Sequence, residues 1–308
     1  MSRRILVTPR SVTRAGHASL RKLEAVGFEV VFCTPGTLPS EDELCRLVQD
    51  CEGYLAGVES ITSRVLATAK KLQVISRNGT GVDSVDLAAA EARGIKVLRA
   101  EGANARGVAE LTFSLILALS RNLTTNDRSL KADGWTRTAG FELEGKTLGL
   151  FGFGRIGRLV ARFALAFDMR ILASDPYAQA QGTDGIEFAE PEEIIRQSDI
   201  ISFHCPPPKG GGPLLDAGAI AKLKKGVLLI NTARAGLIDG EALLQALDDG
   251  RVGGLGLDVF ESEPPVDRRL AAHPKVIATP HIGGFTPESI DRAMTIAVDN
   301  LLEALAEP

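Results

Sequence analysis

A chain of 308 residues, 44% hydrophobic and 24% charged, is long enough for two domains with buried cores. Its formal net charge is only −4, and no basic stripe of the kind that binds nucleic acid is visible. The longest apolar stretch, Leu111 to Leu119, is about half as long as a membrane span. The four scattered cysteines show no metal-ligand spacing, so we expect reduced thiols, no metal and a cytoplasmic location.

Short apolar runs alternate with helical patterns, which predicts parallel sheets with helices on both faces. The first set of predicted strands spans residues 5–7, 29–32, 53–56, 73–76 and 96–98. A long, mostly apolar helix from about Val108 to Arg121 follows it. None of the turns in this first set carries a phosphate-binding glycine motif.

The second set of predicted strands spans residues 147–151, 170–174, 200–203, 227–230, 254–257 and 276–278. The last segment, Pro287 to Leu305, has apolar residues at helical spacing and needs an apolar surface to cover. We expect it to cover the first sheet. The predicted fold is therefore α/β, with two Rossmann-like or flavodoxin-like doubly wound domains: residues 1–100 plus 285–308, and residues 101–284. An active-site cleft is expected between the domains.

A glycine motif, Gly152-Phe-Gly154-Arg-Ile-Gly157, follows the apolar strand that begins at Thr147 and opens a helix near Arg158 to Phe167. This arrangement is typical of a dinucleotide site, where the helix N-terminus faces the pyrophosphate. Asp175 ends the next strand, where its carboxylate can accept hydrogen bonds from ribose hydroxyls and repel a 2′-phosphate. The sequence therefore predicts NAD, rather than NADP, as the cofactor.

Polar residues follow three of the later strands, at the sheet edge where open α/β sheets bind ligands. The three segments are Asn231 to Gly236, Asp258 to Pro265 and Thr279 to Gly284. Arg234 can hold a substrate carboxylate through two charge-assisted hydrogen bonds. His281 can donate a proton to a carbonyl oxygen, and Glu263 can orient its ring. We therefore predict Arg234, Glu263 and His281 as the catalytic residues of a 2-oxo acid reductase.

The chain resembles the D-isomer-specific 2-hydroxyacid dehydrogenase family over essentially its full length. The matching segments are Asn78 to Asp83, Gly152 to Gly157 with Asp175, Asn231 to Gly236, Asp258 to Pro265 and Pro280 to Gly284. The resemblance implies the same three catalytic residues and a homodimer formed through the cofactor domains, with Ala132 to Leu143 as a contact. It implies substrate binding by the backbone N–H groups of Asn78, Gly79 and Thr80. It also implies cofactor binding by Gly152, Gly154, Arg155, Ile156, Gly157, Asp175, His204, Thr232 and Asp258, the last through the nicotinamide carboxamide.

The substrate is expected to be a small 2-hydroxy or 2-oxo acid, with 3-phosphoglycerate as the leading candidate. The segments from Ile75 to Asp83 and Gly107 to Thr112 resemble the phosphoglycerate dehydrogenase branch, and Arg77 is a candidate phosphate contact or a salt-bridge residue. Glu59 lies where that branch tends to carry a basic residue, and the Pro206 to Gly212 turn also departs from the family pattern. The alternatives are a hydroxypyruvate or glyoxylate reductase and, in another class, an NAD(H)-sensing protein that resembles the family's corepressors.

The remaining histidines are given minor roles. His204 ends a strand near the expected nicotinamide side and is assigned a supporting role in that pocket. Solvated surface is the competing interpretation for His204 and the expectation for His17 and His273, with His273 in a turn before a proline. Trp135 is assigned to packing or to a dimer contact.

Overall fold

The computed structural model describes residues 3–178, 184–208 and 210–306. The chain divides into two compact units. Unit 1 consists of Met1–Asn104 and Pro287–Pro308, and unit 2 of Ala105–Thr286. The boundaries expected from the sequence lie a few residues from these. Lys209, within the atypical proline and glycine turn, is outside the described residues.

Unit 1 is built on a five-stranded parallel sheet in the order β2-β1-β3-β4-β5. Its strands are β1 (Arg3–Val7), β2 (Phe28–Phe32), β3 (Gly53–Ala56), β4 (Val74–Arg77) and β5 (Lys96–Arg99). Its helices are α1 (Arg10–Ala15), α2 (Leu20–Ala25), α3 (Glu41–Leu47), α4 (Ser63–Thr68), α5 (Leu87–Ala92) and α13 (Pro287–Ala306). Ser40, Thr62 and Asp86 cap α3, α4 and α5, because each side chain accepts a backbone hydrogen bond in the first turn.

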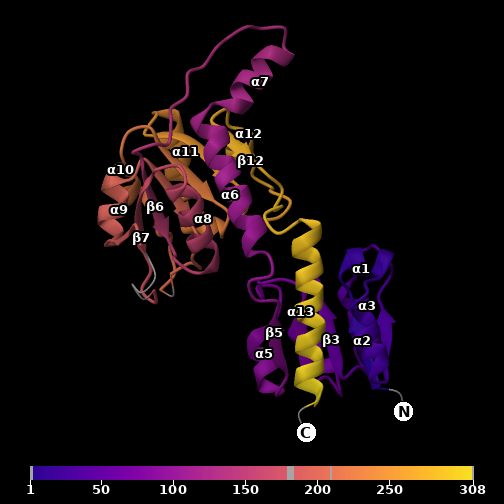
Figure 1. Cartoon of the computed structure of the whole chain (residues 1–308). Helices are drawn as coiled ribbons and strands as arrows, with labels where there is room; N and C mark the ends of the chain where they lie inside the picture. Colours follow the sequence, from indigo (N-terminus) through magenta and orange to yellow (C-terminus); the bar gives the residue numbers. More distant parts are fainter. Residues whose placement is uncertain (1–2, 179–183, 209, 307–308) are drawn as a thin grey trace. The chain divides into compact units, whose positions relative to one another are not determined.

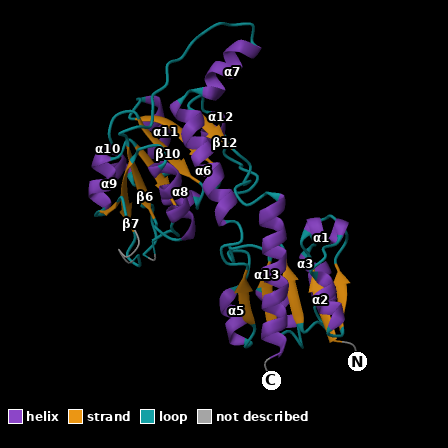
Figure 2. Cartoon of the chain, in the orientation of Figure 1, coloured by secondary structure: helices purple, strands orange, loops and turns teal. Residues whose placement is uncertain are grey.

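Both faces of this sheet are buried, as in other purely parallel sheets. Ile5, Leu55 and Val74 face a core formed with α1, α2 and α13, whereas Leu6 and Tyr54 face α3, α4 and α5. The apolar face of α13 lies on β3, β4 and β5, as Figures 1 and 2 show. The prediction that the last helix covers the first sheet is therefore confirmed.

Unit 2 is built on a seven-stranded parallel sheet in the order β12-β11-β10-β9-β6-β7-β8. Its strands are β6 (Thr147–Phe151), β7 (Arg170–Ser174), β8 (Ile186–Phe188), β9 (Ile200–Phe203), β10 (Val227–Asn231), β11 (Val252–Leu257) and β12 (Val276–Ala278). Its helices are α6 (Ala105–Ser120), α7 (Leu123–Lys131), α8 (Arg155–Leu165), α9 (Pro191–Gln197), α10 (Ala217–Ala221), the 3₁₀ helix η1 (Ala235–Leu237), α11 (Gly240–Asp248) and α12 (Arg269–Ala272). Cores lie on both faces of the sheet, one beneath α6 and α8 and the other beneath α9, α10 and α11.

Three elements differ from the sequence-based expectation. The helix after the glycine motif begins at Arg155, not near Arg158, which makes Gly154 its N-cap. Strand β8 was not predicted, because it is a three-residue edge strand with little burial. Helix α7 was not predicted either, because its sequence is polar and it buries none of its residues.

The chain order of the strands reverses once in each sheet. In unit 1 the chain runs from β1 to β2 on one side and then to β3 on the other, and in unit 2 β7 and β9 lie on opposite sides of β6. In open α/β sheets, ligands bind outside the carboxyl ends of the strands at such a reversal. The carboxyl ends of β6 and β9, and those of β1 and β3, are therefore candidate binding positions in their respective units.

Candidate active site

The glycine turn after β6 tolerates no side chain at two of its three glycines. Gly152 has φ +95°, and a Cβ there would lie 2.5 Å from the carbonyl oxygen of His204. A Cβ on Gly157 would lie 2.3 Å from the carbonyl oxygen of Gly152. The first glycine thus permits the close approach of β6 and β9, and the third lets α8 begin directly over the turn.

Gly154 differs from these two glycines, because no atom lies within 4 Å of the position its Cβ would take. It is the N-cap of the 11-residue helix α8, which has no capping side chain and no acidic residue in its first turn. The N–H groups of Arg155 and Ile156, the first helical residues, have no acceptor within the helix. The open space and the positive helix end fit a dinucleotide pyrophosphate.

Asp175 connects the end of β7 to this turn. One carboxylate oxygen accepts from the N–H of Phe153 at 2.7 Å and the other from the N–H of Tyr177 at 2.8 Å. Each oxygen retains a further lone pair. The carboxylate is therefore held in one orientation and can still accept hydrogen bonds from ribose hydroxyls.

His204 lies after β9, against the glycine turn. Its Nε2 is 3.0 Å from the Ser202 hydroxyl, while its Nδ1 is buried and has no partner among the described residues. Burial lowers the pKa of His204 to about 3. The ring is therefore neutral at physiological pH, and the prediction that His204 supports the site without acting as an acid is consistent with this environment.

The other two histidines are not solvated, which corrects the prediction from sequence. His17 Nε2 lies 3.2 Å from Asp291, and its side chain is 16% exposed. His273 Nε2 lies 3.3 Å from Asp248, with the side chain 11% exposed. Packing against neighbouring helices shields both rings from solvent, and the sequence pattern does not reveal that packing.

His281 and Glu263 form a direct pair. Nδ1 of His281 lies 2.7 and 2.9 Å from the two carboxylate oxygens of Glu263. The His281 side chain is 52% exposed. A carboxylate at Nδ1 fixes the ring orientation and places the N–H proton at that nitrogen in the neutral ring, so Nε2 is the nitrogen left for proton transfer.

Asp258 holds the loop that carries His281. It is 1% exposed, and its carboxylate accepts from the Thr279 hydroxyl at 2.6 Å and from the N–H groups of Ile282 and Gly283, both at 2.8 Å. Between these anchors His281 has φ +52°, a left-handed conformation that is uncommon for a side-chain-bearing residue. Asp258 therefore positions His281. Sequence reasoning missed this role, and its predicted contact with nicotinamide stays a prediction.

Arg234 follows β10 in a backbone segment fixed by Asn231. The Asn231 side chain donates to the Arg234 carbonyl at 2.8 Å and accepts from the Ala233 N–H at 3.0 Å. The half-buried guanidinium donates to the Ala233 carbonyl at 2.7 Å. Thr232 shares a 2.9 Å hydrogen bond with Thr112 of α6. Strands β10, β11 and β12 are neighbours, so Arg234, Asp258 and His281 emerge at one edge of the unit 2 sheet.

The predicted substrate residues of unit 1 follow β4 and are half-buried. The N–H groups of Asn78 and Gly79 already donate to Ala56 and Arg77, both at 2.8 Å. In the described part of the chain, the Thr80 N–H has no acceptor and the buried side-chain oxygen of Asn78 has no donor. Arg77 donates to the Asn78 carbonyl at 2.9 Å, and burial lowers the pKa of its guanidinium.

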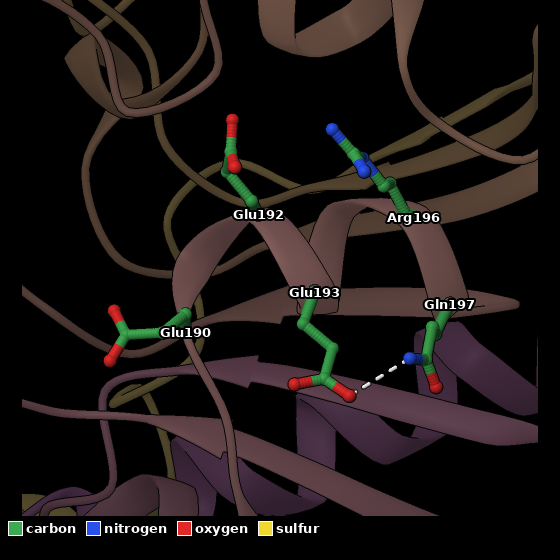
Figure 3. Close-up of a pocket in the computed structure, with 5 residues that line it drawn as sticks. All are labelled: Glu190, Glu192, Glu193, Arg196 and Gln197. Carbon is green, nitrogen blue, oxygen red and sulfur yellow. Dashed lines mark hydrogen bonds between the residues drawn. The ribbon is translucent and has the colours of Figure 1, made fainter.

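A shallow hollow on α9 is unrelated to these groups. It is lined by the polar side chains of Glu190, Glu192, Glu193, Arg196 and Gln197 (Figure 3). Gln197 donates to Glu193 at 2.8 Å, and Glu192 pairs with Lys222. No predicted site residue lines it, and the hollow is a solvated helix face.

The fold, the glycine turn and the histidine–carboxylate pair together define a dinucleotide-dependent oxidoreductase. Residues 113–283 match the family model for the NAD-binding domain of D-isomer specific 2-hydroxyacid dehydrogenases. The chain belongs to this family. It is accordingly an NAD-dependent enzyme that acts on the CH–OH group of its donors.

Known relatives agree with this assignment. A hydroxypyruvate reductase of Thermotoga maritima is 40% identical over 271 residues, which cover 86% of this chain and 88% of the relative. A D-3-phosphoglycerate dehydrogenase of Mycobacterium tuberculosis is 40% identical over 273 residues, 87% of this chain but 52% of the relative. The chain thus spans about half the length of that relative. The crystal structure of a protein from Thermus thermophilus has a TM-score of 0.87 at 36% identity, covering 98% of this chain and 97% of the other.

Proposed function

We propose that unit 2 carries the catalytic centre for the reversible reduction of a small 2-oxo acid to a D-2-hydroxy acid. The observation that carries this proposal is the hydrogen bond between His281 and Glu263, at 2.7 Å, at the same sheet edge as Arg234. A fixed imidazole can serve as a proton donor, and a guanidinium beside it can hold a carboxylate.

In the proposed reaction, NADH supplies the hydride that reaches the carbonyl carbon. Arg234 binds the substrate carboxylate and so orients the carbonyl group. His281 donates the proton on Nε2 to the carbonyl oxygen, which becomes the hydroxyl, and the ring is left neutral. Glu263 keeps the ring aligned through Nδ1, and in the reverse direction Nε2 takes the proton back.

Replacement of His281 tests the assignment. The variant His281→Asn should lower kcat by about 10²- to 10⁴-fold, the usual contribution of a positioned acid, and leave the Kd for NADH nearly unchanged. Stopped-flow kinetics and NADH fluorescence titration measure the two quantities. Retention of full activity would remove His281 from the proton-donor role.

Two substrate types fit the family. A phosphorylated acid such as 3-phosphohydroxypyruvate is favoured by the relatives named D-3-phosphoglycerate dehydrogenase and by Arg77 at the end of β4. Hydroxypyruvate or glyoxylate is favoured by the relative named hydroxypyruvate reductase, of which the match covers 88%. NADH oxidation with all three acids separates the alternatives. Binding of NADH with no turnover of any of them would instead favour a sensing protein.

We also propose that the enzyme is a homodimer that uses α7 and the segment after it. Helix α7 buries none of its residues, and Leu123, Leu130 and Trp135 are 54%, 59% and 82% exposed. Exposed apolar side chains gathered in one segment are typical of an interface. Light scattering should give twice the chain mass for the wild type and a monomer–dimer mixture for Trp135→Ser. A monomeric wild type would refute the dimer.

The proposed location is the cytoplasm, where free thiols persist. All four cysteines are free, and burial raises the pKa of Cys33, Cys51 and Cys205 to about 11, so these thiols are protonated and unreactive at neutral pH. No helix in the described ranges is long and apolar enough to cross a membrane. Cell fractionation of the tagged protein tests the location.

A further inference from the structure

Unit 1 has a buried carboxylate at the point where its strand order reverses. That point lies between the carboxyl ends of β1 and β3, and the residues that follow these strands are Thr8 and Gly57 to Glu59. Glu59 is 2% exposed. In open parallel sheets this is the position where backbone and hydroxyl donors hold the anionic group of a ligand.

At this position the donors bind Glu59 itself. Its Oε1 accepts from the Tyr54 hydroxyl at 2.8 Å, from the Gly57 N–H at 2.9 Å and from the Thr8 hydroxyl. The other oxygen, Oε2, is buried and has no partner among the described residues. A Cβ on Gly57 would lie 2.7 Å from Oε2, so the side chain folds back over the end of β3.

The negative charge of Glu59 affects other groups in unit 1. It helps to raise the pKa of Cys33 to about 11, after the larger effects of burial and of Glu43. Burial followed by Glu59 raises the pKa of Tyr54. It also acts on the pKa of Arg77, where it opposes the stronger effect of burial. The Arg77 guanidinium, however, donates to the Asn78 carbonyl rather than to Oε2. Among the described residues, the hydrogen-bond donors to the Glu59 carboxylate are therefore all neutral groups, and no cation contacts it.

We propose that Glu59 is a specificity-determining residue that makes this enzyme select an unphosphorylated 2-oxo acid over the corresponding phosphate ester. The carboxylate acts as an internal anion: it occupies the Gly57, Tyr54 and Thr8 donors that could otherwise bind a phosphate, and its charge repels one. This inference rests on the proposed function, because it concerns the substrate of the same reaction. Like-charge juxtaposition is a common means of excluding a wrong ligand.

The test compares kcat/KM for hydroxypyruvate with that for 3-phosphohydroxypyruvate, in the same preparation and with NADH. The wild type should favour hydroxypyruvate by at least about tenfold, as a like-charge penalty implies. Glu59→Gln keeps the size and one acceptor oxygen but removes the charge. It should shift the ratio toward the phosphorylated acid by about tenfold or more.

Two variants serve as matched controls. Tyr54→Phe removes one donor to Oε1 and keeps the carboxylate. Glu91→Gln removes an exposed charge near the end of α5, which leads to the amino edge of the sheet. Neither should move the ratio more than about twofold, since each keeps the charge at Glu59.

A wild type that prefers 3-phosphohydroxypyruvate would overturn the inference, whether or not the variants fold. An unchanged ratio in a Glu59→Gln protein with a normal melting temperature would overturn it as well. Absence of turnover with either acid and with glyoxylate would refute the proposed function instead. In that case the inference is tested by thermal shift with 3-phosphoglycerate, which should stabilise Glu59→Gln more than the wild type. Equal shifts would contradict it.

Discussion

At the scale of single residues, Asp258 holds the loop that carries His281 in place, a role that its position in the sequence does not reveal. Its buried carboxylate accepts three hydrogen bonds from the segment around His281. The sequence identified His281 and Glu263 as a pair, since both residue types are chemically distinctive. It did not identify the anchor of the loop, because the donors are mostly backbone groups whose direction depends on the folded chain.

Asp258→Asn tests this anchor. The amide has one acceptor oxygen, and an NH₂ group takes the place of the other carboxylate oxygen. That NH₂ group faces the N–H of Ile282 or Gly283, so at least one buried donor loses its hydrogen-bond acceptor. Such a loss costs about 2 kcal/mol. Thermal or urea unfolding should show that decrease, and kcat should fall because His281 is no longer held. Thr279→Val removes one of the three donors and is the milder comparison. Wild-type stability and kcat in Asp258→Asn would contradict a positioning role.

Asp175 is predicted to determine the choice between NAD and NADP. Asp175→Ala removes the charge that would repel a 2′-phosphate and the hydrogen bond to the Phe153 N–H. The ratio of kcat/KM for NADPH to that for NADH should rise about tenfold or more, because one repulsive charge is removed. Asp184→Ala, which removes an exposed acid on the loop after it, is the control. Unaltered discrimination in Asp175→Ala would refute the assignment.

At the scale of elements, the glycine turn and α8 act as one structure. The motif itself was visible in the sequence, because glycine spacing and the flanking apolar strand are local features. The helix start was placed three residues too late, since Arg155 and Ile156 resemble loop residues until their backbone is seen in the first turn. The sequence does not predict strand β8 or helix α7, because neither has apolar residues at the regular spacing of a strand or a helix.

Two alanine substitutions in this turn should differ in their effect on stability. At Gly154 a Cβ meets no atom within 4 Å, so Gly154→Ala should keep the melting temperature and weaken NADH binding by filling the pyrophosphate space. At Gly157 a Cβ would lie 2.3 Å from a backbone oxygen, so Gly157→Ala should lower the melting temperature as well. Differential scanning fluorimetry with and without NADH measures both. Equal melting temperatures for the two variants would contradict this account of the turn.

At the scale of the whole molecule, the alternation of strands and helices was enough to predict two parallel-sheet units, and the matching fold of known relatives confirms the class. The prediction succeeded because parallel strands are buried on both faces and read as continuous apolar runs. The environments of His17, His204 and His273 could not be predicted. Their burial depends on contacts between segments distant in the sequence, such as α13 and the chain before α2.

His204 should also influence the pH dependence of folding. Burial lowers its pKa from 6.5 to about 3, so the unfolded chain takes up a proton below pH 6.5 that the folded chain does not. Stability is therefore retained above pH 6.5 and lost as the pH falls toward 3, by about 2 kcal/mol between pH 7.5 and pH 5. His204→Asn should remove this part of the dependence in urea unfolding. An identical pH profile in the variant would contradict it.

The most direct test of the central claim is a single-turnover measurement in which enzyme saturated with NADH is mixed with hydroxypyruvate. We predict rapid loss of NADH absorbance in the wild type, D-glycerate as the product, and a rate slower by about 10²- to 10⁴-fold in His281→Asn with the same NADH affinity. Formation of the L-isomer would contradict the proposed D-2-hydroxy acid product. An equal rate in wild type and variant would contradict the claim that His281, held by Glu263, delivers the proton.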